Sequence, residues 1–449
     1  MRSVSRRGVR RIKEGHQIAS PRRRRGRCAL YAACSALVML RPLEGRSQCA
    51  GTDEFRSAPE LPGYLHTDGS QIVDSSGNSV RIVSIGWNGM SVVPGQLDGL
   101  DGPFKGIEEN LAQIRKAGFN AVRISWTDAS LRSPQDMATY RQLVRAAGSV
   151  GMRIIFDHHQ NEGTASAKWA CAGQQVNGLW FDRGPGTDGT NGCGDRGTVS
   201  AADFQQNSAS FAGNWAGNPT VIGFDLDNEP LTVPGHINWG EGGPTDIRAM
   251  CTNVGNAILA VDPGALIICE GPQNYSGSFA GTGIAPEGDL TAVKSKPVVL
   301  DIPNRIVYSV HEYPAEVSDV RIDSGPDYIK RMNSSWGYLV TENIAPVWIG
   351  EMGSSMKSVR AEAWADTLLP YMNGRAPGGI TLPKGNPGVG GSWWLWGNLD
   401  DQNPNGYLLP DGRPRPAQAR VVRQMMVAAC RDGDPTSARR SDRPSRPVK

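Results

Sequence analysis

The chain has 449 residues, of which 39% are hydrophobic and 20% charged, a length that fits about three average domains or a single large one. Its net charge of +3 combines two opposite parts, because residues 1–27 carry a net charge of +10 and the remaining 422 residues a net charge of −7. The larger part is therefore mildly acidic, which argues against nucleic acid as a partner.

The N-terminal residues have the pattern of an export signal. Four consecutive arginines at 22–25 precede an apolar stretch of 13 residues at 28–40. That stretch is too short to span a bilayer comfortably but has the length of a signal-peptide core. We therefore predict that residues 1–47 are an export segment, and that the protein is secreted or periplasmic without a membrane span once this segment is removed.

The cysteines fit the same interpretation. Two of the eight, Cys28 and Cys34, lie in the predicted export segment, and the remaining six are Cys49, Cys171, Cys193, Cys251, Cys269 and Cys430. An even number in an exported protein predicts disulfides, and we favour the pair Cys171–Cys193 because both lie in one glycine-rich loop. The spacings match no zinc-ligand pattern, so we expect no metal site.

Turn residues between 64 and 82 predict a β-hairpin that closes one end of the domain. After it, strand-like and helix-like segments alternate. Strands are expected at 81–85, 121–126, 153–156, 221–226, 265–269, 305–310, 347–350 and 392–396. Helices are expected at 107–117, 137–147, 201–215, 246–261, 328–340, 359–372 and 417–429, whereas 272–303 shows no clear helical pattern. Eight strands alternating with helices predict an α/β fold, a single (β/α)8 TIM barrel with an N-terminal hairpin.

This barrel is expected to occupy residues 62–430, preceded by a lead-in at 48–61. Residues 431–449 are rich in Arg, Ser, Asp and Pro and are predicted to be a disordered tail. No Pro/Ser-rich linker leads to a second domain. We therefore expect no separate second module.

Two of the predicted strands end in a glutamate. The fourth runs into Asn228-Glu229 and is stopped by Pro230, and the seventh ends at Glu351 before Gly353. Catalytic groups of parallel barrels sit at these strand ends, so the two carboxyl groups are expected to face each other across the barrel mouth. Cleavage of a glycosidic bond requires such a pair, although each glutamate alone could be a structural ion-pair partner.

Polar residues mark three other strands. Arg123 interrupts an apolar strand and needs a carboxylate partner, either as a structural ion pair or to keep a nucleophile ionised. His158 and His159 are adjacent, so at most one faces the barrel axis. His311 and Tyr313 are two residues apart and share a side. Tyr313 is expected to hydrogen-bond the glutamate of the seventh strand, and His311 to orient the substrate or tune the acid.

Tryptophans gather at the predicted rim. Trp393, Trp394 and Trp396 end the eighth strand, and Trp87 follows the first. Aromatic faces stack on the apolar faces of sugar rings, which is a role for rim tryptophans in a polysaccharide cleft. Core packing is the alternative for Trp393 and Trp394.

In order, these motifs resemble those of the cellulase family, glycoside hydrolase family 5 of the retaining (β/α)8 barrels. The resemblance spans roughly residues 62–410 and rests on seven motifs. They are Gly-Trp-Asn-Gly, Ala-Val-Arg-Ile, Phe-Asp-His-His, Asp-Asn-Glu-Pro, His-Glu-Tyr, Ile-Gly-Glu-Met-Gly and the tryptophan cluster. Segments 217–225 and 343–351 are similar to secreted bacterial endo-β-1,4-glucanases.

The resemblance implies a retaining hydrolase that cuts β-1,4-linked glucan internally. It implies that Glu229 is the acid/base and Glu351 the nucleophile. It also implies substrate contacts for Trp87, Arg123, His159, Asn228, His311, Tyr313 and Trp396. We expect a monomer that needs no cofactor and whose partner is a β-linked polysaccharide or oligosaccharide.

Two alternatives remain at this point. Residues 160–162 and 397–401 depart from the cellulase pattern, so the substrate could be another β-linked glycan such as mannan, xyloglucan or a glycolipid. The chain could also be a non-catalytic carbohydrate-binding barrel. The presence of both glutamates argues against this last reading.

Overall fold

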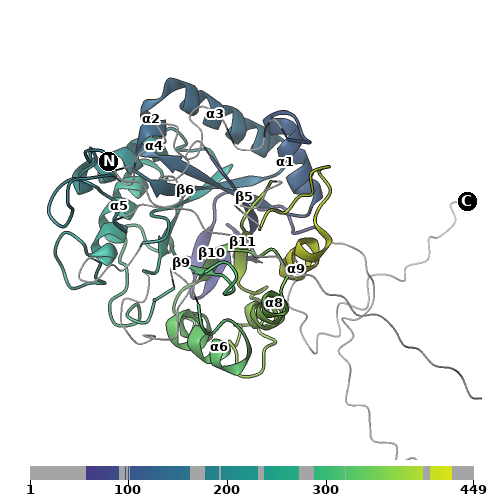
Figure 1. Cartoon of the computed structure of the whole chain (residues 1–449). Helices are drawn as coiled ribbons and strands as arrows, with labels where there is room; N and C mark the ends of the chain where they lie inside the picture. Colours follow the sequence, from purple (N-terminus) through teal and green to yellow (C-terminus); the bar gives the residue numbers. More distant parts are fainter. Residues whose placement is uncertain are drawn as a thin grey trace, which may run out of the picture. The chain divides into compact units, whose positions relative to one another are not determined.

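The computed structural model of the chain (Figure 1) describes residues 57–89, 97, 100, 102–161, 177–191, 194–230, 237–272, 288–318, 320–397 and 405–426. The predicted export segment, most of the lead-in, the predicted tail and the favoured Cys171–Cys193 pair lie outside these residues. In the part of the chain that is described, no helix combines the length and the apolar character that crossing a membrane requires.

Eight parallel strands close into a barrel, which confirms the predicted (β/α)8 fold. Each predicted strand overlaps an observed one, and the last pairs with the first through Gly391 and Val83 to close the ring. In chain order the strands are β4 (Val83–Trp87), β5 (Ala121–Thr127), β6 (Arg153–Gln160), β7 (Val221–Asp225), β8 (Leu266–Glu270), β9 (Ile306–Glu312), β10 (Val347–Met352) and β11 (Gly390–Trp393).

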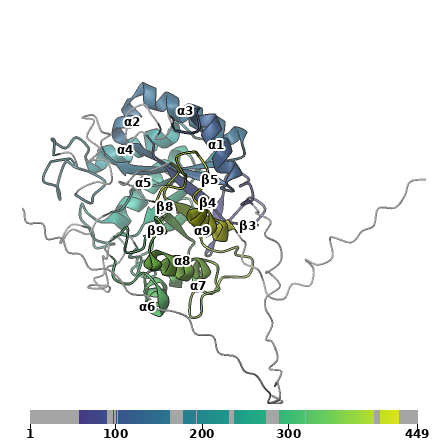
Figure 2. The ribbon, with the colours of Figure 1, turned by 45° about the vertical axis from the view of Figure 1, so that its right-hand side comes forward.

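Helices surround this barrel, as Figures 1 and 2 show. Several begin after a capping side chain, since Ser133, Ser200, Asp246 and Ser358 each accept a hydrogen bond from the backbone three residues on. The described residues between β8 and β9 hold no helix, as expected. The helices are α1 (Gly106–Lys116), α2 (Asp128–Arg132), α3 (Pro134–Ser149), α4 (Ala201–Gly213), α5 (Ile247–Val261), α6 (Gly325–Met332), α7 (Tyr338–Thr341), α8 (Val359–Met372) and α9 (Pro416–Met426), with a π-helical turn, η2 (Asn333–Gly337), between α6 and α7.

The N-terminal segment forms a small antiparallel sheet with one strand more than the predicted hairpin. Its strands are β1 (His66–Asp68), β2 (Gln71–Val73) and β3 (Ser79–Val80). Leu65 and Ile72 of this segment pack against Ile155, Val307 and other residues near the beginnings of the barrel strands. The N-terminal end of the barrel is therefore filled by apolar side chains.

The side chains inside the barrel change character along each strand. On β5 the inward positions pass from Ala121 to Arg123, and on β6 they pass from Ile155 to Asp157 and His159. The residues between them, such as Phe156, face outward into the core beneath the helices. The polar half of the lumen lies at the C-terminal ends of the strands, where parallel barrels carry their sites.

A disulfide joins Cys251 of α5 to Cys269 of β8. Both residues are buried between the helix layer and the barrel. The sequence alone does not predict this pair, because the proximity of the two cysteines depends on how α5 packs back on the strand that follows it.

Candidate active site

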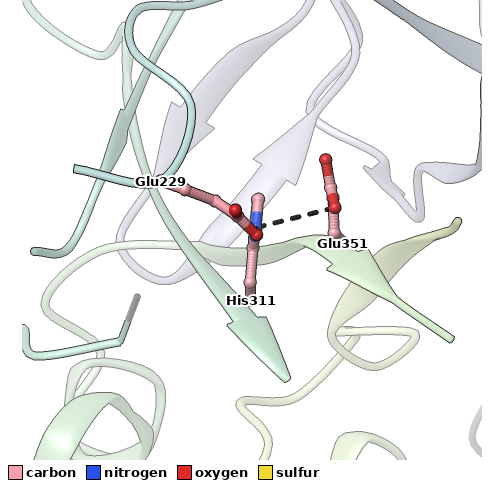
Figure 3. A group of neighbouring side chains, drawn as sticks. All are labelled: Glu229, His311 and Glu351. Atoms are coloured by element: carbon pink, nitrogen blue, oxygen red, sulfur yellow. Dashed lines mark hydrogen bonds and ion pairs between the residues drawn. The ribbon is translucent and has the colours of Figure 1, made fainter. Parts of the chain in front are cut away.

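Glu229 and Glu351 meet at the mouth of the barrel, with His311 between them (Figure 3). Glu229 lies four residues beyond β7, and Glu351 lies on β10. The Nδ1 atom of His311 is 3.0 Å from Glu229 Oε1 and 3.9 Å from Glu351 Oε2. One oxygen of each glutamate and this ring nitrogen all lie within 4.8 Å of one another. The two carboxyl groups are thus close enough to act on one bond.

Glu351 is held by strong donors on both oxygens. Arg123 Nη1 lies 2.6 Å from Oε1, and the Tyr313 hydroxyl donates to Oε2 at 2.6 Å. Burial raises the pKa of Tyr313 well above its ordinary value, and the charge of Glu351 raises it further, so the hydroxyl stays a donor. Such charge-assisted hydrogen bonds favour an ionised carboxylate at Glu351.

Arg123 is the centre of a buried ion-pair network. Its guanidinium contacts Asp157 at 2.9 Å and Asp225 at 3.0 Å, and it donates to the Asn228 side chain at 2.9 Å. Burial alone would lower the pKa of Arg123. The charges of Asp157, Asp225 and Glu351 outweigh this effect, so the pKa lies well above its ordinary value. The sequence predicts a carboxylate partner for Arg123 but does not identify either aspartate as that partner. The sequence does mark these aspartates, because each occupies an inward-facing position, one on the third predicted strand and one on the fourth.

Only one of the two adjacent histidines enters the site. His159 Nδ1 lies 2.6 Å from Asp157, and its ring stacks on Trp394 with 5.6 Å between ring centroids. His158 faces the other way, with Nε2 at 2.9 Å from Asp128 of α2. Adjacent strand residues alternate between the two faces of the sheet, which explains this division.

Glu270, at the end of β8, is a site residue that the sequence analysis missed. Its Oε2 accepts a hydrogen bond from the Glu229 backbone N–H at 3.0 Å, and its Oε1 lies 3.2 Å from His311 Nε2. Burial lowers the pKa of His311 to about 3, so the imidazole is neutral. The sequence signal was present, because an apolar strand ends in a carboxylate here just as in the fourth and seventh strands.

Trp394 lies beside the residues that surround the two glutamates, whereas Trp87 and Trp396 do not. Trp394 lies against His159 and over β4, where a Cβ on Gly86 would come within 2.3 Å of its ring. Trp87 follows Gly86 on β4, so its side chain points outward from the barrel. There it is fully buried in the core under the helices.

Trp396 packs away from the barrel axis. Its ring is stacked between Phe104 and Tyr407, with centroids 6.1 and 6.0 Å away, and its N–H donates to Asn110 of α1 at 2.9 Å. It borders a cavity of about 510 Å³ between α1 and α9. The predicted substrate contacts of Trp87 and Trp396 therefore do not fit this arrangement, and Trp394 offers the ring instead.

Among the described residues, Glu229, His311 and Glu351 are the group whose donor atoms lie close enough to hold a metal ion. Both oxygens of Glu351 already accept hydrogen bonds from Arg123 and Tyr313. We therefore name no metal ligand in it.

Comparison with known proteins agrees with this geometry. Residues 73–400 match the family described as cellulase, glycosyl hydrolase family 5. An endoglucanase of Paenibacillus polymyxa is 31% identical over 341 residues, covering 70% of this chain and 78% of that protein. The major extracellular endoglucanase of Xanthomonas campestris is 25% identical over 371 residues, covering 78% and 68%.

A solved complex of a Pyrococcus horikoshii endocellulase with cellotetraose has a similar fold. It is 23% identical, with a TM-score of 0.65 over 81% of this chain and 98% of that one. The match over residues 73–400, together with the relative at 31% identity, shows that this chain belongs to the cellulase family, family 5 of the glycosyl hydrolases.

Proposed function

We propose that this glycoside hydrolase is a secreted endo-β-1,4-glucanase that works with retention of configuration. The observation that carries the mechanism is the close approach of Glu229 and Glu351, since one carboxyl oxygen of each lies within 4.8 Å of an oxygen of the other. Retaining glycosidases separate their carboxyl groups by about 5–5.5 Å, whereas inverting enzymes leave room for a water between them.

The environments of the two glutamates support opposite roles. Glu351, bound by Arg123 and Tyr313, is the nucleophile that attacks the anomeric carbon. Glu229, whose Oε1 lies 3.0 Å from neutral His311, is the general acid. It gives its proton to the leaving oxygen as the bond from that oxygen to the anomeric carbon breaks, with the electron pair staying on the oxygen.

The second half of the reaction reverses these roles. Glu229, now a carboxylate, takes a proton from water as the water oxygen attacks the anomeric carbon. The bond between that carbon and Glu351 breaks, and Glu351 returns to its ionised form. Two displacements on the same carbon leave the product with the β configuration.

The substrate and the location rest on other support. The relatives named above are endoglucanases, one of them extracellular, and the Pyrococcus enzyme is crystallised with cellotetraose. The Trp394 ring beside the site is suited to stacking on a sugar. The signal-like residues 1–47 support secretion.

The test is to follow carboxymethylcellulose by viscosity and by reducing ends in parallel. Internal cleavage lowers viscosity well before reducing ends accumulate. Glu351→Gln should abolish both the fall in viscosity and the release of reducing ends. Mannan, xylan and xyloglucan serve as competing substrates. If one of them is turned over faster than carboxymethylcellulose, the glucanase assignment is wrong although the family stands.

A further inference from the structure

Glu316 joins the two chain segments that follow β9 and β10. Tyr313, whose hydroxyl reaches Glu351, lies just beyond Glu312 and Met352, the last paired residues of these strands. Three residues after Tyr313, the Glu316 carboxylate accepts hydrogen bonds from three serine hydroxyls of the segment after β10. The serines are Ser354, Ser355 at 2.8 Å and Ser358 at 2.6 Å. One side chain therefore bridges the segment of the proposed nucleophile and the segment of its hydroxyl donor.

The three serine hydroxyls are fully used. Each has a single hydrogen to donate, and Glu316 takes it. Each serine oxygen also accepts a nearby backbone N–H. The pairs are Met356 to Ser354 at 2.8 Å, Lys357 to Ser355 at 3.3 Å and Ala361 to Ser358 at 3.0 Å. Burial alone would raise the pKa of Glu316, but the hydroxyl hydrogen bonds outweigh it and lower the pKa, so the carboxylate is ionised.

The segment that holds these serines has an uncommon backbone conformation. Met356 has a φ of +55°, in the left-handed region that residues with a side chain seldom adopt, and its side chain is buried. From the other side, Gln418 of α9 donates to the carbonyl oxygens of Ser354 and Ser355 at 3.3 and 3.0 Å. The segment is thus held between Glu316 and α9.

The same segment continues directly into the site. Gly353 lies between Glu351 and the serines, and a Cβ on it would come within 2.4 Å of the Trp394 carbonyl oxygen. The Trp394 N–H donates to the Met352 carbonyl at 2.8 Å. The chain after the nucleophile is therefore packed against the residue that offers its ring to the substrate, and Glu316 connects this chain to Tyr313.

We propose that Glu316 is a positioning residue that keeps the Tyr313 hydroxyl on Glu351 by fixing the two segments to each other. This inference rests on the proposed role of Glu351 as the nucleophile. The hydroxyl lies 2.6 Å from the carboxylate, and a hydrogen bond weakens steeply once its angle falls below about 120°. A shift between the two segments would therefore weaken the contact. Glu316 acts through Tyr313 and is not itself a catalytic residue.

The experiment is a double-mutant cycle in the full chain, with kcat/KM on a chromogenic cellobioside as the readout. Glu316→Ala alone should lower kcat/KM by about 10-fold, since misplacing a group in the site by about 1 Å can cost about 100-fold. In the Tyr313→Phe background the hydroxyl is already absent, so Glu316→Ala should lower kcat/KM by less than about 2-fold further. An unchanged kcat/KM in Glu316→Ala, or two losses that multiply in the double variant, would overturn the proposal.

Glu316→Gln tests whether the hydrogen bonds themselves form the bridge. Ser354 and Ser355 both donate to Oε1 of Glu316, and the amide oxygen of a glutamine can accept both hydroxyls. This variant should therefore keep more of kcat/KM than Glu316→Ala does. Equal losses in the two variants would contradict the proposed bridge.

Asp74→Ala is the matched control. The Asp74 carboxylate accepts three hydrogen bonds, from Ser76 and Asn78, in the turn between β2 and β3 of the N-terminal sheet. Its loss should leave kcat/KM at the wild-type value, with thermal unfolding used to confirm that every variant is folded at the assay temperature. A loss equal to that of Glu316→Ala would show that the effect is not specific to Glu316, and would overturn the assignment.

Glu351→Gln separates this proposal from the mechanism beneath it. If that variant keeps its activity, the nucleophile role of Glu351 is wrong, and the role of Glu316 falls with it. If Glu351→Gln is inactive and Tyr313→Phe is impaired, but the losses of Tyr313→Phe and Glu316→Ala multiply, only the role of Glu316 is wrong.

Discussion

Replacing Tyr313 with phenylalanine removes a single oxygen from the site. The hydroxyl donates to Glu351 Oε2 at 2.6 Å, and Tyr313 is 5% exposed, so water is poorly placed to take over this bond. The other oxygen of Glu351 keeps its contact with Arg123 at 2.6 Å. The variant therefore tests one of two donors that favour the ionised nucleophile.

The magnitude follows from the type of bond. A hydrogen bond to a charged group contributes about 1.5–3 kcal/mol, which corresponds to a factor of roughly 10 to 150 in a rate constant. The hydroxyl binds and orients the proposed nucleophile, so its loss should lower kcat/KM by about that factor.

The assay is kcat/KM on a chromogenic cellobioside. Tyr328→Phe is the matched control, because the Tyr328 hydroxyl donates to the buried Glu312 at 2.9 Å outside the barrel. That variant should lose stability and keep the wild-type kcat/KM. An unchanged kcat/KM in Tyr313→Phe would refute the idea that this hydroxyl supports the nucleophile.

Three further predictions concern stereochemistry and stability. The first product released should be the β anomer by proton NMR before mutarotation, and an α anomer would exclude retention. Replacing both Cys251 and Cys269 with serine opens a crosslink across 18 residues and should lower the free energy of unfolding by about 3 kcal/mol in urea titrations. Burial opposes protonation of His158, but Asp128 and Asp227 raise its pKa to about 9. Because the folded-state pKa is raised above the ordinary value of 6.5, this stabilisation is complete below about pH 6.5, falls as the pH rises, and is lost above about pH 9. Wild type should therefore lose more stability than His158→Gln between pH 6.5 and 9, and equal losses would contradict this.

The sequence predicted the features that depend on the spacing of apolar residues and on the residues at the ends of strands. Apolar runs fixed the order of the barrel strands, and alternation correctly separated His158 from His159. The same rule, carried one residue further, would have turned Trp87 outward, because β4 extends to that residue. The rule could not place Trp396, because β11 ends at Trp393 and the chain beyond it no longer alternates.

Contacts between distant segments were the other limit. The partners of Arg123 come from three different strands, and local sequence cannot say which carboxylates converge on it. The Cys251–Cys269 bond likewise depends on how α5 lies against β8. Glu270 is a different case. Its position at the end of a strand can be seen in the sequence, but no second motif beside it indicates a role in the site.

The apolar filling at the N-terminal end of the barrel constrains how the reaction is supplied. Leu65, Ile72 and Trp348 help to close that end, so reactants cannot pass through the barrel from below. In the proposed mechanism, the attacking water must arrive by the opening through which the first product leaves. A sugar chain that lingers there excludes water and is itself an acceptor for the glycosyl group. In that mechanism, the balance between hydrolysis and transfer to another sugar depends on how quickly the first product leaves the mouth of the barrel and lets water in.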